Sequence, residues 1–224
     1  MGVLNQMKIF LHSFCVSLLL ILGLFFGVSC SNVEPSISGI TSTVVFDYES
    51  MDKTPQVRLS LFVEASDLQR MEKLTALNEE TGYQWTISQP RKFSGKNNRT
   101  YAGYTNLVAP KNEFIPQGRY SITYTDAQEK ICSTYTFVSY DNEFYKAKGS
   151  KFPLNIRGSY SEKIALYNKD GDLIYFGNLK PDWSDSKIIV RDQTDATVKR
   201  ICYTMNNNAV CVMMPKEDLP ASDL

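Results

Sequence analysis

Apolar and polar residues alternate along most of this chain, and this period of two restricts the fold more than any other feature. In Val57–Glu64 the apolar residues fall on odd positions, and in Arg119–Thr125 they fall on even positions. Further runs rich in β-branched and aromatic residues predict strands at 44–48, 83–87, 100–107 and 131–139. Short strands at this spacing, with turn residues between them, predict an all-β fold with an antiparallel sandwich.

The segment 66–74 departs from this alternation. It has a capping-box start and apolar residues at every third position, which are features of a short helix. The competing interpretation is a hairpin in which 73–77 and 83–87 flank a turn. We expect a short turn or helix at 66–71, followed by this hairpin.

An apolar residue, a proline and a tyrosine follow one another as Phe114, Pro116 and Tyr120. This spacing resembles the corner motif of fibronectin type III and related immunoglobulin-like domains. The resemblance implies that the Tyr120 hydroxyl bonds back to the chain while its ring enters the core. It also makes Trp85 a candidate for the core tryptophan. It covers residues 38–140, for which we expect an immunoglobulin-like sandwich.

Residues 141–216 are expected to form a smaller, β-rich C-terminal domain, followed by a tail at 217–224. The run Asn168–Asp172 predicts one hairpin turn and the three asparagines at 206–208 predict another. A region of this size would bury little core alone. We therefore expect it to pack on the first domain or to carry a disulfide.

The disulfide expectation rests on the register of the second hairpin. A two-residue turn at Asn206 and Asn207 would place Cys202 opposite Cys211 in a non-hydrogen-bonded pair, within disulfide range. We predict a cross-strand Cys202–Cys211 disulfide, although a longer turn would shift the register. Cys132 would then be a free thiol.

An apolar run at 16–26 ends in small residues directly before Cys30. These are parts of a secretory signal, and the junction resembles a bacterial lipoprotein signal, in which the cysteine is acylated and becomes the new N-terminus. The resemblance implies a signal peptide at 1–29 and a lipid-anchored linker at 30–37 that begins with acylated Cys30. The protein would then be held in the bacterial cell envelope by a membrane anchor.

The leader is also compatible with two other interpretations. Gly27 stands where the lipoprotein pattern prefers leucine, and Gly27-x-Ser29 also fits ordinary cleavage into a freely secreted protein, in which Cys30 becomes a candidate partner for Cys132. An uncleaved membrane anchor is the third interpretation. If the sorting rule of lipoproteins applies, Ser31 favours the outer membrane.

The charge and histidine content exclude several classes of function. The single histidine, His12, lies in the expected signal peptide, so the mature chain lacks imidazole for catalysis or for metal ligation. Without residues 1–29 the chain carries 23 basic and 24 acidic residues. This balance gives no basic field for nucleic acid. We predict no cofactor and no metal.

Two short motifs have the spacing of chemical sites but weak support. Ser184 and Lys187 are spaced as a serine–lysine pair, yet they stand in a polar segment without partner motifs. Asn168, Asp170 and Asp172 alternate as calcium ligands do, but no closing glutamate follows. We interpret the first as a loop and the second as a turn. No catalytic residue is predicted.

Aromatic side chains offer the remaining candidate for binding. Tyr101, Tyr104 and Trp183 are the residues that we would assign to an exposed platform for sugars or peptides, although aromatic residues also build sandwich cores. We expect a non-enzymatic binding or structural module with an envelope protein or glycan as partner. The alternative is a carboxylate-based enzyme acting on envelope polysaccharide.

Overall fold

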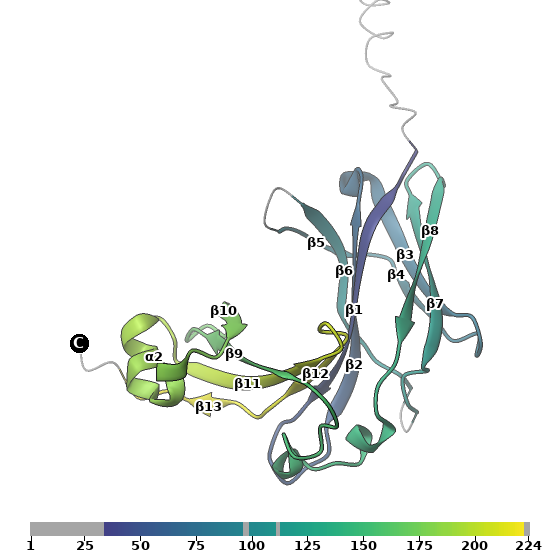
Figure 1. Ribbon diagram of the computed structural model, residues 1–224. Helices are drawn as coiled ribbons and strands as arrows, with labels where there is room; N and C mark the ends of the chain where they lie inside the picture. The colour runs from purple at the N-terminus through teal and green to yellow at the C-terminus, as the bar shows by residue number, and fades with distance from the viewer. Residues whose placement is uncertain (1–33, 96–98, 111–112, 222–224) are drawn as a thin grey trace, which may run out of the picture. The chain divides into compact units, whose positions relative to one another are not determined.

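A computed structural model describes residues 34–95, 99–110 and 113–221. The expected signal peptide and Cys30 lie outside the described residues. Strands dominate, and the protein has an all-β fold with two sheets (Figure 1). Residues 35–224 form one compact unit.

Sheet A is the larger sheet and sheet B has four strands. In spatial order, sheet A contains β10 (Leu173–Asn178), β9 (Ser161–Tyr167), β11 (Val198–Met205), β12 (Val210–Met213), β1 (Ile37–Asp47), β2 (Gln56–Ala65), β6 (Thr100–Leu107) and β5 (Arg91–Ser94), with β13 (Glu217–Asp218) paired to β11. Sheet B contains β4 (Gln84–Ile87), β3 (Met71–Asn78), β7 (Gly118–Asp126) and β8 (Ile131–Val138). The helices are η1 (Leu68–Arg70), η3 (Asn142–Tyr145), η4 (Gly149–Lys151), η5 (Pro181–Ser184) and α2 (Ser186–Asp192).

The alternating strands meet in one core between the two sheets. On β2, Leu59 and Leu61 are buried, and on β7 Ile122 and Tyr124 are buried, while the residues between them are less so. All four belong to one hydrophobic cluster. The alternation predicted for both strands is therefore confirmed. We call residues 37–138 the sandwich region.

The segment that departs from alternation folds as expected. A single 3₁₀ turn, η1, precedes β3, and β3 pairs with β4 in an antiparallel hairpin. Asp67 enters the turn with a φ of 50°, in the left-handed region, which aspartate tolerates better than most residues. The short turn and the following hairpin are both confirmed.

The corner motif forms the hydrogen bond that its resemblance implies. The Tyr120 hydroxyl donates to the carbonyl of Pro116 over 2.7 Å, and its ring is fully buried. Trp85 packs against the same core and stacks on Tyr120, with ring centroids 5.9 Å apart. Phe114 is instead 48% exposed on the ring of Tyr145, and the neighbouring Ile115 is buried.

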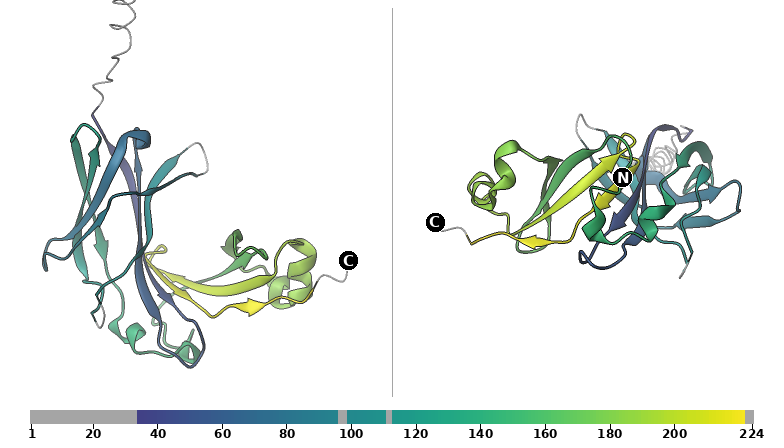
Figure 2. Two further views of the ribbon diagram at one scale, coloured as in Figure 1. Left: turned by 180° about the vertical axis from the view of Figure 1, so that it is seen from behind. Right: turned by 60° about the horizontal axis from the view of Figure 1, so that its bottom comes forward.

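The C-terminal part of the chain continues sheet A. β12 runs parallel to β1, with Val44 opposite Val210 and Asp47 opposite Met213, and both views agree that they lie side by side (Figures 1 and 2). The far end carries its own small core, in which Trp183 and Ile189 pack against Ile164 of β9. We call residues 161–219 the C-terminal region. The expected tail at 217–224 includes β13 and the buried Leu219, so its first residues belong to the fold.

The register predicted for the second C-terminal hairpin is wrong. Asn206, Asn207 and Asn208 all have positive φ values, of 50°, 54° and 69°, which asparagine adopts more readily than other residues. These three residues and Ala209 make the connection longer than two residues, so that Met205 pairs with Val210.

The longer connection takes the two cysteines out of direct cross-strand register, so that they are diagonal neighbours. Cys202 faces Met213, and Cys211 faces Thr204. Both cysteines are free thiols, and so is Cys132. The predicted Cys202–Cys211 disulfide is therefore absent from the structure.

Candidate binding groove

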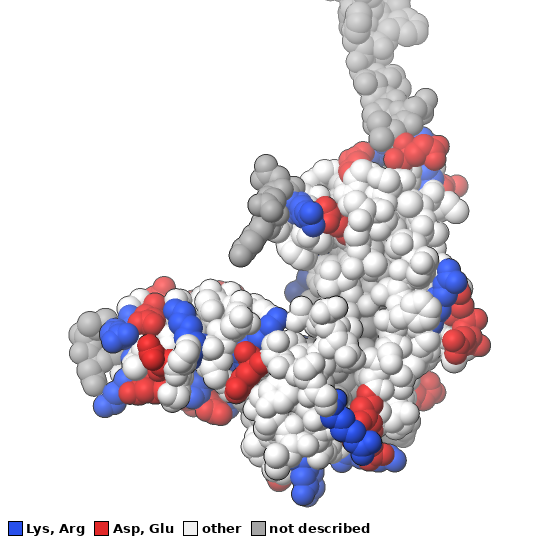
Figure 3. All heavy atoms as spheres, viewed as in Figure 1, with Lys and Arg blue, Asp and Glu red and all other residues white. Residues whose placement is uncertain are grey.

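The two faces of sheet A have different surroundings. One face packs against sheet B and, at the far end, against η5 and α2. On the opposite face, side chains from β1, β2, β9, β10 and β12 line an open groove of about 410 Å³. The space-filling view shows the surface hollowed where the C-terminal strands leave β1 (Figure 3). Both regions of the chain thus build one groove.

The groove is mostly apolar. Val45, Ala165 and Cys211 lie buried in it, and Tyr167 and Phe176 add aromatic surface. Phe176, on the edge strand β10, is 48% exposed. Concave, apolar sites of this size with a few polar groups are typical of small-molecule binding.

The groove carries two cations and no carboxylate among its lining residues. The Lys163 ammonium donates to the side-chain oxygen of Asn208 over 2.6 Å and lies 5.6 Å from the centroid of the Phe176 ring. Within the described ranges, no acidic side chain pairs with Lys163. Its charge is therefore available to a bound anion.

The second cation, Arg58, is already paired. It donates to one oxygen of Asp47 over 2.8 Å, and the buried Arg200 donates to the other oxygen. Arg200 also donates to the carbonyl of Met214 over 2.7 Å. A single carboxylate thus joins β1, β2 and β11 where the two regions meet. We call Asp47, Arg58 and Arg200 the seam triad.

Two thiols lie side by side at the groove. The Cys202 thiol donates to the backbone carbonyl of Arg200 over 3.9 Å, and its interaction with Cys211 and its burial both raise the pKa of Cys202. The interaction with Cys202 lowers the pKa of Cys211, and the charges of Arg58 and Lys163 act in the same direction. Cys211 lines the groove and Cys202 does not, so Cys211 is the better placed of the two thiols for contact with a ligand.

The predicted aromatic platform does not form. Trp183 is only 1% exposed, and its indole nitrogen donates to Asp192 over 2.9 Å, so its assignment to an exposed surface is wrong. Tyr101 stacks on Phe93 with centroids 5.2 Å apart, and Tyr104 packs against the sandwich core. The three residues share no surface, because Trp183 is needed to fill the small C-terminal core.

The surroundings of the two weakly supported motifs do not match the chemistry that their spacing suggests. Ser184 and Lys187 are both exposed, whereas a serine–lysine nucleophile needs a buried lysine. The side-chain oxygen of Asn168 accepts bonds from the backbone amides of Asp170 and Asp172, which closes the β9–β10 turn. In the described part of the chain, no three His, Cys, Asp or Glu side chains gather as a metal site.

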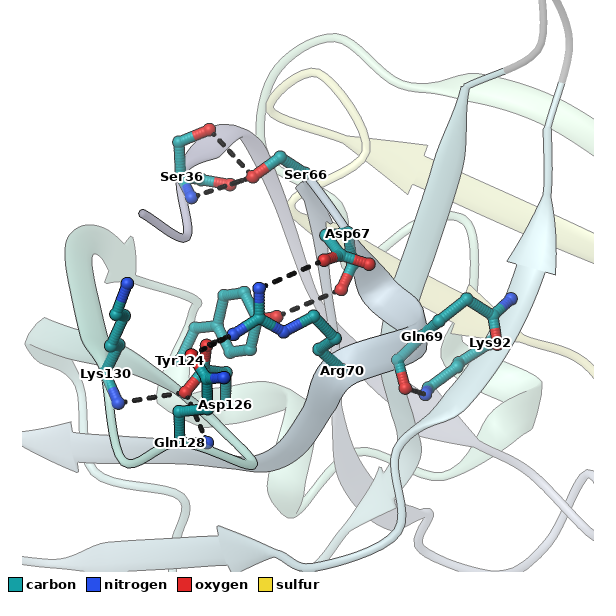
Figure 4. Close-up of polar contacts among 10 residues, drawn as sticks. All are labelled: Ser36, Ser66, Asp67, Gln69, Arg70, Lys92, Tyr124, Asp126, Gln128 and Lys130. Atoms are coloured by element: carbon teal, nitrogen blue, oxygen red, sulfur yellow. Dashed lines mark hydrogen bonds and ion pairs between the residues drawn. The ribbon is translucent and has the colours of Figure 1, made fainter. Parts of the chain in front are cut away.

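A polar cluster fastens one end of the sandwich region (Figure 4). Arg70 donates to the buried Asp126 over 2.9 Å and lies 3.6 Å from Asp67. Asp126 also accepts from the backbone amides of Gln128 and Lys130. Each of these two carboxylates is paired with Arg70, as Asp47 is paired in the seam triad. We therefore interpret Asp67 and Asp126 as residues that link η1 to the β7–β8 turn through Arg70, and not as a pair of catalytic acids.

Comparison with known proteins adds no family to this picture. No family model matches the chain, and no curated protein matches it. Among the described residues, no helix is both long enough and apolar enough to span a membrane.

Sequence reasoning missed Lys163, Asn208 and Phe176 as groove residues. The signal that could have found Phe176 is the run Leu173–Phe176, which is apolar on both faces of one short strand. Leu173, Ile174 and Phe176 are all exposed at the edge of sheet A. The exposed apolar face of an edge strand is not needed for folding, so it indicates a surface that binds another molecule.

Proposed function

We propose that the protein is a lipid-anchored, non-enzymatic binding module of the bacterial cell envelope, and that its groove binds a small acidic amphiphile. Such a ligand has an apolar chain or ring and one acid group. The observation that carries the proposal is the groove that both regions build, with an apolar surface and the uncompensated charge of Lys163.

The charge of the groove favours binding of an acidic ligand over the enzyme alternative. An acid group would exchange water for a charge-assisted hydrogen bond to Lys163, while its apolar part covers Tyr167 and Phe176. A hydrolytic mechanism with two acids would instead need carboxylates in the groove, and none lines it.

Strand order supports an immunoglobulin-like assignment for the sandwich region. The order β1-β2-β6-β5 opposite β4-β3-β7-β8 corresponds to the arrangement of A-B-E-D opposite C′-C-F-G in such domains. The Tyr120 bond to Pro116 stands at the start of the strand that corresponds to F. These loop-connected strands provide a rigid support for the open face of sheet A.

The anchor part of the proposal rests on Cys30 in the sequence. Cys30 lies four positions before Glu34, where the described chain begins. A chain segment of this length reaches at most about 14 Å. An acylated Cys30 would therefore hold the sandwich region close to an envelope membrane, the outer membrane under the lipoprotein sorting rule, within reach of an envelope protein or glycan.

The binding proposal is tested with residues 31–224, which contain the whole compact unit. Anilinonaphthalene sulfonate, an apolar aromatic with one acid group, is the fluorescent probe. We expect one probe per chain, displaced by dodecanoate and much less by dodecanol, which has the same chain length without the acid. Lys163→Gln should weaken dodecanoate binding roughly tenfold to a hundredfold.

The matched control for this variant is Lys169→Gln. Lys169 is an exposed lysine in the turn next to the same strand, outside the groove. We expect its substitution to leave dodecanoate binding unchanged. Equal binding of dodecanol and dodecanoate, or equal loss in both lysine variants, contradicts the proposal.

The anchor is tested separately in cells that process lipoproteins. The full chain should partition into the detergent phase and incorporate labelled palmitate, and Cys30→Ser should abolish both. Cys132→Ser serves as the control cysteine. Unchanged partition of the Cys30→Ser chain would rule out lipidation, whatever the groove binds.

A further inference from the structure

Three sulfur-containing side chains lie on one face of the β11–β12 hairpin. Cys211 and Met213 are two residues apart on β12 and so point to the same face. Cys202 stands directly opposite Met213 and diagonally from Cys211. Cys202 and Cys211 belong to one hydrophobic cluster, and Met213 packs against it. The three residues form a triangle on the open face of sheet A.

The contact between the two thiols suits a bridging ion better than a disulfide. Diagonal neighbours in an antiparallel pair are about 7–8 Å apart, whereas disulfides need Cα atoms within about 6.8 Å. Two thiolates at about 2.3 Å from one metal ion are themselves roughly 4 Å apart. The side chains of Cys202 and Cys211 share one buried cluster, so their sulfurs can reach such a separation.

The surroundings provide access and charge balance. Cys211 and Met213 line the groove, which gives an ion a route to the site. Val45 and Ala165 form a dry apolar shell. Arg58 donates to the Met213 sulfur over 3.8 Å, and Arg58 and Lys163 line the same groove as Cys211.

We propose that Cys202, Cys211 and Met213 bind one soft, thiophilic cation of the Cu(I) class. Soft thiolate and thioether ligands select Cu(I), zinc or iron–sulfur clusters, and an iron–sulfur cluster needs more cysteines than these two. A structural zinc site needs four ligands, and neither the triangle nor the groove lining adds a histidine or carboxylate. This inference does not depend on the proposed amphiphile.

Binding involves no electron transfer. Cu(I) enters as Cu(I), and both thiols bind as thiolates, with their protons released to the solvent. The site of one cation and two thiolates carries one net negative charge. Lys163 and Arg58 lie where they offset that charge.

The test is a Cu(I) titration of reduced residues 31–224 under anaerobic conditions, in competition with bicinchoninate. We expect one tightly bound Cu(I) per chain and two fewer protons by native mass spectrometry. Cys202→Ser and Cys211→Ser should each weaken binding at least about a hundredfold, and Met213→Leu roughly tenfold. Cys132→Ser, the remaining cysteine in this chain, should change nothing.

Folding of each variant is checked by cooperative urea unfolding. Met213→Leu conserves volume and should fold normally, so it tests the site even if a serine variant does not fold. Equal Cu(I) affinity in Met213→Leu and the native chain reduces the site to two ligands and overturns the three-sulfur assignment. Binding that follows Cys132, or alkylation showing a Cys202–Cys211 disulfide in the unreduced chain, overturns the site itself.

Discussion

The sandwich region and the C-terminal region solve the problem of burying apolar surface in different ways. The sandwich region closes its core between two sheets, with Leu61 and Ile122 completely buried between them. The C-terminal region covers its strands with η5 and α2 and takes β1 as the neighbour of β12. The second region depends on an edge that the first provides, and in return Tyr203 of β11 and Val212 of β12 are buried in the sandwich core.

This difference explains where the groove lies. A sandwich alone would present the outer face of β1 and β2 as a plain surface. Because β12, β11 and β9 extend the same sheet from β1, their side chains join those of β1 and β2 around one hollow. The seam triad fixes the join, since the carboxylate of Asp47 binds Arg58 from one region and Arg200 from the other.

The largest expected effect comes from the small core of the C-terminal region. Trp183→Ala should lower the free energy of unfolding by about 3–5 kcal/mol, because it empties the centre of that core. Hydrogen exchange should increase first in β9, β11 and α2, while β3 and β7 stay protected. Phe176→Ala, an exposed aromatic of the same region, is the control and should change stability little. Equal loss of protection in β3 and β7 would show that the two regions unfold as one.

The seam triad provides the next test. Asp47→Asn removes the charge that balances the buried Arg200 and should cost about 2–3 kcal/mol in urea unfolding. The loss should concentrate in β11 and β12. Asp52→Asn, an exposed acid that bonds to Ser50, should leave stability unchanged. Native stability of the Asp47→Asn chain would show that the seam triad does not stabilise the contact between the two regions.

Alkaline pH should affect the sandwich region and its flanking turns. Burial raises the pKa of Tyr48, Tyr120 and Tyr140 above the ordinary value of 10.0. A tyrosine whose pKa is higher in the folded state makes its full contribution to the free energy of unfolding below about pH 10. That contribution decreases as the pH rises further. The free energy of unfolding should fall above about pH 10, by at most about 1.4 kcal/mol per pH unit for each tyrosine. A flat urea midpoint from about pH 9 to about pH 12 would contradict this burial.

The smallest effect concerns the corner motif. Tyr120→Phe removes the hydroxyl that bonds to Pro116 and should cost about 0.5–1.5 kcal/mol. Tyr135→Phe, on the exposed face of β8, is the matched control and should be neutral. The loss in Tyr120→Phe should appear in β7 and not in β11. Equal effects of both substitutions would show that the hydrogen bond from Tyr120 to Pro116 does not contribute to stability.

Local patterns predicted most strands of both regions but not how the regions join. Alternation specifies which face of a strand is buried, and it does so equally for Leu59 of β2 and for Val212 of β12. It does not specify the neighbour, so the parallel pairing of β12 with β1 could not be read from the sequence. The hairpin register was missed because it depends on three successive left-handed asparagines.

The helix α2 was missed for a different reason. Its run Ile188–Val190 is β-branched and disfavours a helix locally. The helix forms because Asp185 caps it, accepting from the amide of Lys187 over 2.9 Å, and because Ile189 and Val190 bury against the sheet. The groove followed from these unpredicted contacts, whereas the burial of one face of β2 and of β7 in the sandwich core followed from alternation.

The most direct test of a groove shared by both regions is hydrogen exchange of residues 31–224 with and without dodecanoate. Dodecanoate should slow exchange in β1 and β2 of the sandwich region and also in β9 and β10 of the C-terminal region. Both effects should disappear together in Lys163→Gln. Protection confined to one region, or found instead on the exposed aromatic face of β8, would contradict the shared groove.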